Sequence, residues 1–334
     1  MIGLRRTPGR RYALVLGMIG AVATTLAIAG AQQPAAGARR GSPAPPGPIA
    51  LPVERASNVF FVKATVNGVG PMWFTVDTGA TLTVIDPAVA TRIGKTPLSI
   101  GARANVGVAT DHTELATVSN IRIEIAGVPA FVAPTLYVVP VRGNAQALGH
   151  QIDGVIGTDF LQRYLVEFNY AAGTLSLTPP PFAGKPSEPG LPITTDGNVL
   201  LAKASVGLVD GDVLTARLLV DTGSGGGLTL TSPFVRQHRL IERFYTPTSR
   251  GDATSGRSSL TIGINGVMTA PVIVLGSLGI GSATWSSPRS SLSREAGGLT
   301  ASTQFDGLLG AELLRRFTLT IDYPGKMIWL RQAK

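Results

Sequence analysis

The tripeptide Asp-Thr-Gly occurs twice in this chain, at residues 77–79 and 221–223, and each copy follows a strand-like apolar run. Each copy is followed later in the chain by a second motif, an Asp-Gly pair and then two apolar residues and a glycine, at residues 153–157 and 306–310. One aspartate on a turn is ordinary, because aspartate is a common turn residue. Two copies in matched surroundings predict a duplicated fold, whose halves each bring one carboxylate to a pseudo-twofold axis.

The chain repeats beyond these tripeptides. After the first one, residues 81–89 are typical of a strand followed by a short helix, and residues 228–235 follow the same order in the second half. Asp86 and Ser232 are the expected N-caps of the two helices, each with proline at the first helical position. The second copy carries two extra residues in the glycine run 225–227, which is interpreted as a loose turn because no phosphate-binding motif follows it.

The closing segments of the two halves, residues 153–177 and 306–330, align without a gap. Besides the Asp-Gly pairs and the second glycine, the shared positions are Leu161 and Leu314, Arg163 and Arg316, and Tyr170 and Tyr323. Gene duplication is the simplest account of this match. The aspartates of the Asp-Gly pairs, Asp153 and Asp306, are expected to cap their turns rather than to act as further acids.

Strand-like patterns fill most of the space between the motifs. In residues 121–125 and 260–264, every second side chain is apolar, and many of the side chains are β-branched. Helical periodicity is confined to short stretches near residues 87–93, 158–164, 233–240 and 311–316. The chain is therefore predicted to be all-β, with two pseudo-twofold-related, β-barrel-like lobes and a cleft between them.

Composition divides the chain into five parts. Residues 1–31 hold an arginine-rich start and an apolar segment, and the Pro/Ala/Gly-rich residues 32–52 are expected to be a flexible linker without a core. The two lobes are expected at residues 53–178 and 191–334, joined by the proline-rich linker 179–190.

The apolar residues 12–31 end in Ala29-Gly30-Ala31, as a secretory signal peptide does. The protein is therefore expected to be exported, either to a periplasm or as a secreted protein. The alternative is an uncleaved anchor, because the run is about as long as a spanning helix requires. Such an anchor would tether the body of the protein to a membrane.

The formal net charge of +9 does not indicate nucleic-acid binding, because much of it lies in the N-terminal part. Without residues 1–31, which contain four arginines and no acidic residue, the net charge is +5. The chain has no cysteine, which excludes disulfides, Cys-based zinc sites, a thiol nucleophile and lipoprotein anchoring. His112, His150 and His238 lie far apart without metal-ligand spacing, and no Gly-x-Ser-x-Gly motif suggests a serine hydrolase.

Paired Asp-Thr-Gly turns suit one kind of chemistry. Glycine lets the backbone approach closely, so that N–H groups reach the carboxylate and its twin comes within hydrogen-bonding distance. Threonine can hydrogen-bond to the main chain of the other lobe. Two carboxylates about 3 Å apart cannot both ionise, so they share one proton. The ionised partner can then activate a water against a peptide carbonyl, which the protonated partner polarises.

On these residues the chain resembles the pepsin/retropepsin-like aspartic proteases, and within them bacterial proteins with two retropepsin-like units fused in one chain. The resemblance covers about residues 55–332. It implies an aspartic endopeptidase that acts on polypeptides and needs no metal or cofactor. It also implies a monomer, because one chain supplies both acids. The residues carried over are Asp77 and Asp221 as the catalytic pair, supported by Thr78, Gly79, Ala80, Thr222, Gly223 and Ser224.

Two features depart from that pattern. Ala80 lacks the hydroxyl that Ser224 could offer to its aspartate, so the two carboxylates should be inequivalent. No tyrosine marks a flap, and flap-like hairpins are expected at Val106–Ala116 and Arg250–Ser259, where polar and glycine residues interrupt strands. A non-catalytic peptide-binding or envelope scaffold with the same fold is the competing hypothesis.

Overall fold

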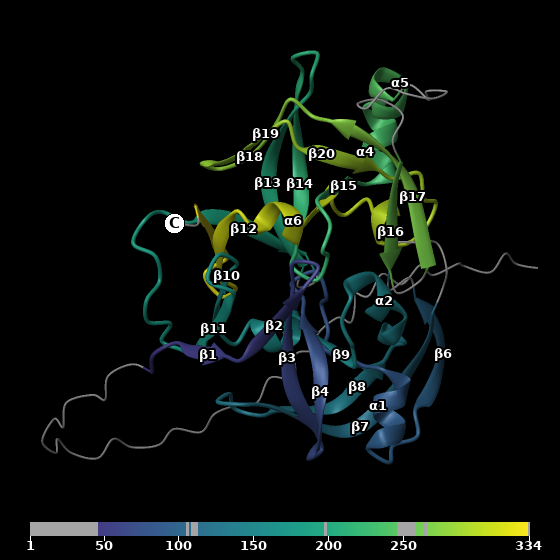
Figure 1. Cartoon of the computed structure of the whole chain (residues 1–334), viewed down its shortest axis with the longest axis vertical. Coiled ribbons are helices and arrows are strands. Elements are labelled where there is room, and N and C mark those ends of the chain that lie inside the picture. The colour runs from purple at the N-terminus through teal and green to yellow at the C-terminus, as the bar shows by residue number, and fades with distance from the viewer. Residues whose placement is uncertain are drawn as a thin grey trace, which may run out of the picture.

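The computed structural model describes residues 46–104, 107, 113–196, 199–245, 258–263 and 266–332. These residues form two lobes stacked along the long axis of the molecule, with the N-terminal half of the chain in one and the C-terminal half in the other (Figure 1). Strands dominate both lobes, which confirms the all-β prediction.

The described residues of the N-terminal half form eleven strands and four short helices. In chain order they are β1 (Ile49–Leu51), β2 (Val53–Ala56), β3 (Val59–Val66), β4 (Val69–Val76), β5 (Val84–Ile85), α1 (Pro87–Arg92), β6 (Leu98–Ala104), β7 (Thr113–Ile125), β8 (Phe131–Val138), η1 (Val141–Asn144), α2 (Ala145–Leu148), β9 (Gly154–Ile156), α3 (Thr158–Leu161), β10 (Leu165–Asn169) and β11 (Thr174–Thr178).

The C-terminal half follows a similar order. Its elements are β12 (Leu191–Asp196), β13 (Val199–Gly207), β14 (Val213–Asp221), β15 (Leu228–Leu230), α4 (Ser232–Gln237), α5 (Leu240–Phe244), β16 (Ser258–Gly263), β17 (Gly266–Val274), β18 (Ser277–Ile280), β19 (Ala283–Ser286), β20 (Arg289–Leu292), η2 (Leu299–Ala301), β21 (Gly307–Gly310), α6 (Ala311–Leu314), β22 (Phe317–Asp322) and β23 (Met327–Gln332).

The strand pairings repeat from one half to the other. The strand before each Asp-Thr-Gly pairs in parallel with the strand of the matching downstream motif, as β4 with β9 and β14 with β21. The strand after each tripeptide, β5 or β15, packs against the other side of that downstream strand in antiparallel fashion. Each downstream motif is therefore threaded between the two strands that flank an Asp-Thr-Gly turn.

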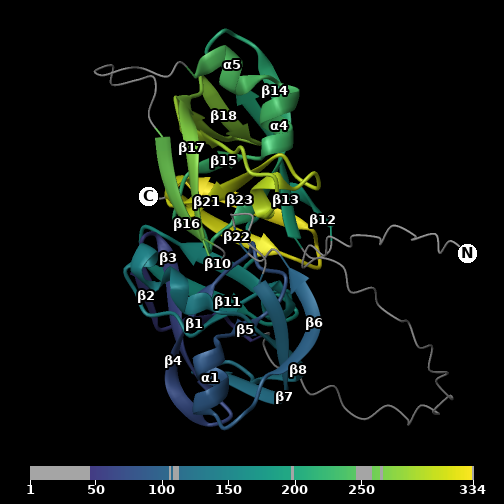
Figure 2. The same cartoon turned by 90° about the vertical axis from the view of Figure 1, so that its right-hand side faces the viewer.

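A section of six neighbouring strands at one end of a larger sheet joins the lobes, in the order β1-β11-β10-β22-β23-β12. Its central strands β10 and β22, one from each half, run antiparallel with Leu165 opposite Asp322 and Asn169 opposite Thr318. These strands lie between the lobes in Figure 2. One hydrophobic cluster continues through both halves, including Phe60, Phe168 and Leu319. The lobes are thus held as one body by backbone hydrogen bonds and a shared core.

Strand β1 corrects the expected linker boundary at residue 52. Ile49–Leu51 pairs with Leu175–Leu177, and Leu51 is buried. The proline-rich composition before it hid this strand, because its partner lies more than a hundred residues away. The second proline-rich linker is also anchored, since Lys185 Nζ binds Asp322 Oδ2 at 2.5 Å and the Trp329 indole donates to Glu188 O at 2.9 Å.

Helices α1, α3, α4 and α6 lie where the sequence predicted short helices. Asp86 caps α1 as expected, accepting a hydrogen bond from Ala88 N at 2.9 Å. The expected cap Ser232 is wrong: it lies inside α4, and its hydroxyl donates to Glu295 O at 2.6 Å. Tertiary contact with the Glu295 carbonyl therefore replaces the local capping bond.

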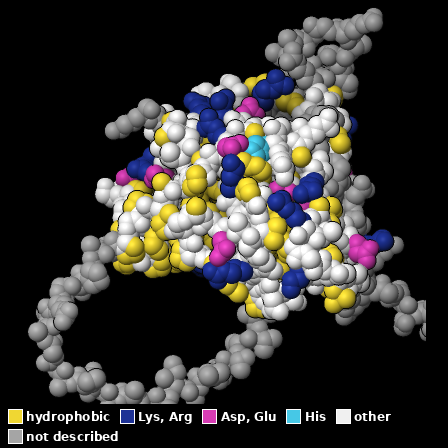
Figure 3. Space-filling model, turned by 60° about the horizontal axis from the view of Figure 1, so that its bottom comes forward, with side chains coloured by type: hydrophobic (Ala, Val, Ile, Leu, Met, Phe, Trp, Pro, Cys, Tyr) yellow, Lys and Arg dark blue, Asp and Glu magenta, His cyan; other side chains and the backbone are white. Residues whose placement is uncertain are grey.

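The surface agrees with the weak charge expected for the body of the chain. On the face shown in Figure 3, Lys and Arg side chains lie singly or beside Asp and Glu side chains, among hydrophobic and uncharged atoms. Within the described residues, no helix has both the length and the apolarity that crossing a membrane requires.

Candidate active site

The two Asp-Thr-Gly turns meet at the boundary between the lobes. Asp77 directly follows β4, and its N–H donates to Ile156 O at 3.0 Å. Asp221 ends β14 and lies opposite Gly310 in the β14–β21 register. The downstream motifs thus support the loops that carry the two acids.

The threonines of the two turns bind across the lobe boundary. Thr78 Oγ1 donates to Val220 O at 2.6 Å, and Thr222 Oγ1 donates to Val76 O at 2.9 Å. Each hydroxyl also accepts the main-chain N–H of the other threonine at 3.1 Å. Both threonines are fully buried. These four reciprocal hydrogen bonds fix one turn relative to the other.

The glycines leave room for the opposite aspartate. A Cβ atom on Gly223 would lie 2.2 Å from Asp77 Cγ, and one on Gly79 would lie 2.8 Å from Asp221 Cγ. Such distances are shorter than any ordinary contact, so only glycine permits this approach. Gly79 N donates to Asp77 Oδ1 at 2.7 Å, and Ser224 N donates to Asp221 Oδ1 at 2.9 Å. The structure therefore brings Asp77 and Asp221 together, each beneath the turn of the other lobe.

This packing makes a prediction for Gly223. Replacing it with alanine should lower kcat/KM of any reaction that the two aspartates catalyse by about 100-fold or more, because the new methyl group displaces the Asp77 carboxyl group. Gly226→Ala is the matched control in the same glycine run, since its Cβ would meet only Ser224 Oγ, at 3.7 Å. Equal kinetics for the two variants would contradict this geometry.

Electrostatic interaction couples the protonation of Asp77 and Asp221, which we call the dyad. Burial raises the pKa of Asp77, although the Gly79 N–H and the other main-chain donors oppose the rise. Burial and the charge of Asp77 raise the pKa of Asp221 well above its ordinary value. The two carboxyl groups lie close enough for each to affect the pKa of the other. Two close carboxyl groups with raised pKa values retain one proton between them, and these causes favour it on Asp221.

Ala80 and Ser224 occupy equivalent places after the two glycines. Ala80 O accepts from Thr158 N at 2.8 Å, and Ser224 O accepts from Ala311 N at 2.7 Å, so each turn is tied to the short helix of its own lobe. In the described part of the chain, the bond from Ser224 to Asp221 comes from its main-chain N–H rather than from its hydroxyl. The expected hydroxyl support for Asp221 therefore does not appear.

Asp153 and Asp306 were expected to cap their own turns, but their carboxylates bind the main chain of a neighbouring strand instead. Asp153 accepts from Trp73 N at 2.9 Å and Asp306 accepts from Arg217 N at 2.7 Å, each four residues before a dyad aspartate. Their main-chain N–H groups return the bond to the carbonyls of the same two residues. Both carboxylates thus hold the strand that delivers the acid of their lobe.

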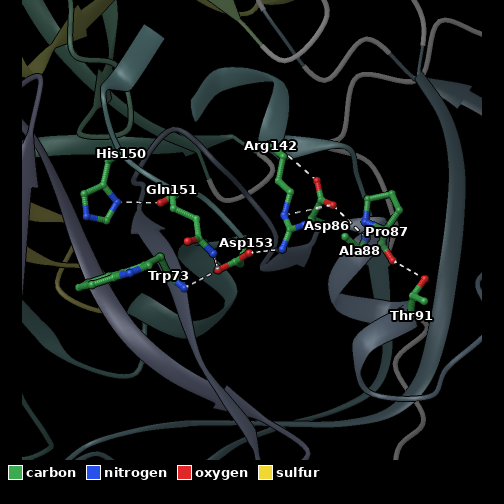
Figure 4. A network of polar contacts seen from close by, with 9 residues as sticks. All are labelled: Trp73, Asp86, Pro87, Ala88, Thr91, Arg142, His150, Gln151 and Asp153. Atoms are coloured by element: carbon green, nitrogen blue, oxygen red, sulfur yellow. Dashed lines mark hydrogen bonds and ion pairs between the residues drawn. The ribbon is translucent and has the colours of Figure 1, made fainter. Parts of the chain in front are cut away.

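The N-terminal lobe adds an ion network to these contacts. Arg142 on η1 stands between two buried carboxylates, with Nη2 at 2.5 Å from Asp153 Oδ1 and Nε at 3.7 Å from Asp86 Oδ1 (Figure 4). The Arg142 N–H also donates to Asp86 Oδ2 at 3.0 Å, and Gln151 Nε2 donates to Asp153 Oδ2 at 2.8 Å. Sequence reasoning missed Arg142, because no local motif surrounds it.

Two hairpins reach across the lobe boundary, β6–β7 from the N-terminal half and β16–β17 from the C-terminal half. Gly107 O, beyond β6, accepts a hydrogen bond from Leu299 N on η2 at 2.9 Å, and β16 contacts η1. Of the expected flap segments, residues 113–116 lie on β7 and residues 258–259 on β16, while residues 106, 108–112 and 250–257 lie outside the described residues. Each hairpin therefore contacts a 3-10 helix of the opposite lobe, η2 or η1.

The histidines take structural places. The His150 ring stacks on Phe61 with centroids 4.1 Å apart and meets the edge of Trp73 at 4.7 Å, while His238 packs on Phe234. His112 lies outside the described residues. Among the residues that the structure describes, no group of His, Asp and Glu side chains has the arrangement of a metal site.

Comparison with known protein families found a match that includes the first Asp-Thr-Gly turn. Residues 62–160 match the model of a family described as aspartyl protease. The matched segment contains Asp77-Thr78-Gly79 and its downstream motif at residues 153–157. No curated protein matches the chain.

Proposed function

We propose that the whole chain is an aspartic endopeptidase with both acids in one polypeptide, because residues 62–160 match an aspartyl protease family. The observation that carries this proposal is the crossed packing of Gly79 on Asp221 and Gly223 on Asp77. This packing brings the two carboxyl groups close together, which is what sharing one proton requires.

The mechanism follows from the protonation of the pair. Ionised Asp77 accepts a proton from a water held between the two carboxyl groups, and the water oxygen bonds to the carbonyl carbon of the substrate. Protonated Asp221 donates a hydrogen bond to the carbonyl oxygen, which becomes the negative oxygen of the tetrahedral intermediate. The proton that Asp77 received then passes to the leaving nitrogen, and the C–N bond breaks. Asp77 is ionised again at the end.

The substrate is a polypeptide in extended form. Hairpins β6–β7 and β16–β17 approach the lobe boundary from both halves, and their strands offer main-chain groups to an extended peptide. Since one chain supplies both aspartates, a monomer suffices for catalysis. The apolar residues 12–31, which end as a signal peptide does, support export to a periplasm or to the medium, or a membrane tether if this segment is not cleaved.

Cleavage of a peptide library by the purified protein across pH 2 to 9 tests the proposal. The rate should follow a bell-shaped profile, because cleavage needs one proton on the pair: both acids are protonated at the acidic end and both are ionised at the alkaline end. The raised pKa values of Asp77 and Asp221 extend the alkaline limb beyond the ordinary range of a single aspartate. A statine-type transition-state mimic should inhibit. Peptide binding without cleavage at any pH would favour the scaffold hypothesis.

A further inference from the structure

Two tyrosines at equivalent positions of the repeat, Tyr170 and Tyr323, have no role in the site described so far. They follow β10 and β22, the central strands of the six-stranded section that joins the lobes. Their side chains are 2 % and 8 % exposed. Neither hydroxyl has a hydrogen-bond partner among the described residues. A buried hydroxyl without a partner is costly, so two at equivalent places call for an explanation.

The antiparallel pairing of β10 with β22 carries each tyrosine toward the opposite lobe. Leu165, just after α3, lies opposite Asp322, so Tyr323 arrives beside the N-terminal lobe helix that supports the Asp77 turn. Asn169 lies opposite Thr318, and β22 follows α6, so the register directs Tyr170 toward the equivalent helix for Asp221, while its ring packs on Phe60 and Phe168. The tyrosines therefore cross, as the threonines of the two turns do.

The surroundings of Tyr323 fit this placement. A cavity of about 140 Å³ is lined by Tyr323 with Thr158, Gln162, Thr195 and Pro324. Thr158 is the residue that holds the back of the Asp77 turn, because its N–H donates to Ala80 O at 2.8 Å and its hydroxyl to Thr81 O at 3.2 Å. The cavity has polar walls and room for ordered water, which could connect the Tyr323 hydroxyl to this turn.

The pKa of each tyrosine is also affected by the aspartate of the opposite half of the chain. Burial, and then the charge of Asp221, raise the pKa of Tyr170, whereas the nearby Arg55 guanidinium lowers it. Burial, and then the charge of Asp77, raise the pKa of Tyr323 well above its ordinary value. Arg55 Nη1 donates to the Tyr170 carbonyl. Both hydroxyls therefore stay protonated and neutral near the two aspartates.

We propose that Tyr170 and Tyr323 are positioning residues of the dyad, each presenting its hydroxyl from the buried side toward the acid of the opposite lobe. The inference rests on the proposed function for its catalytic meaning, but its geometry does not. A neutral donor on the buried side stabilises the dyad when it carries one negative charge, and it does so without occupying the substrate side. Such a donor extends the acidic limb of activity.

The test compares Tyr170→Phe, Tyr323→Phe and the double variant with Tyr164→Phe. Tyr164 is a matched control, because it is buried beside α3 and the dyad does not affect its pKa. In the pH profile of peptide cleavage, each crossing variant should move the acidic limb upward by ~0.3 to 1 pH unit and reduce cleavage on that limb by about two- to tenfold. The control should leave the limb in place. An unmoved limb in both crossing variants would overturn the proposal.

Urea unfolding between pH 3 and 8 gives a readout that needs no activity. Losing a donor raises the folded-state pKa of the dyad further, so the Phe variants should gain more stability on acidification than the parent. This extra gain should largely disappear when Tyr323→Phe is combined with Asp77→Asn, or Tyr170→Phe with Asp221→Asn. If it persists unchanged in these double variants, the tyrosines do not act on the dyad. Absence of peptide cleavage, with this coupling present, would overturn only the proposed function.

Discussion

Replacing either Asp77 or Asp221 with asparagine should lower peptide cleavage by about 1,000-fold or more, since each acid has a different task in the reaction. Asparagine keeps the size of the side chain, and the reciprocal threonine bonds that join the turns do not involve the carboxyl groups. Folding should therefore be preserved. Hydrolysis of a peptide substrate, followed at the pH optimum of the parent protein, measures the loss.

The same variants should be more stable than the parent at neutral pH. The folded-state pKa of each dyad acid is raised, so its contribution to stability is fully present below the ordinary pKa of aspartate and is lost as the pH rises through the raised value. The asparagine variants lack this loss. Asp212→Asn, at an exposed ion pair with Arg243, is the control and should retain both the activity and the stability of the parent. Substantial cleavage by both dyad variants would refute the catalytic assignment.

Replacing Arg142 with methionine should cost about 2–4 kcal/mol of unfolding free energy, the second large effect expected here. The change keeps much of the side-chain volume but leaves Asp153 and Asp86, which are 0 % and 4 % exposed, without their cation. We place the loss at the lower end for a buried pair, because the Arg142 side chain is 42 % exposed to solvent. Urea or thermal unfolding at neutral pH measures the change.

Two further variants separate the ion network from simple loss of packing. Arg217→Met removes the arginine beside Asp306, the equivalent aspartate of the other lobe, which is 25 % exposed, and should cost less than about 1 kcal/mol. Adding Asp153→Asn to Arg142→Met should recover part of the lost stability, because it removes one stranded charge. An equal cost for the two arginine variants would show that Arg142 acts only by packing.

Much of the dyad could be predicted from the sequence because its determinants are local and duplicated. An aspartate, a threonine and a glycine at the end of a strand define a turn by their own chemistry, and a second copy implies its partner. Helices α1 and α4 were predicted from short-range spacing in the same way. The failures have one cause in common. The Asp153 carboxylate accepts a hydrogen bond from Trp73 N, 80 residues away, and residues 49–51 of β1 pair with residues 175–177 of β11. Neither contact leaves a signal in the neighbouring sequence.

The sequence by itself determined that two halves of similar design would each carry one acid on a tight turn, because periodicity, turn chemistry and duplication are all written in neighbouring residues. Only the tertiary structure decided how those acids are held. The crossed glycines, the reciprocal threonine bonds, the Arg142 network and the buried tyrosines join residues that are distant along the chain. Their partners are selected by the packing of the two lobes, and packing depends on the whole fold rather than on any one segment.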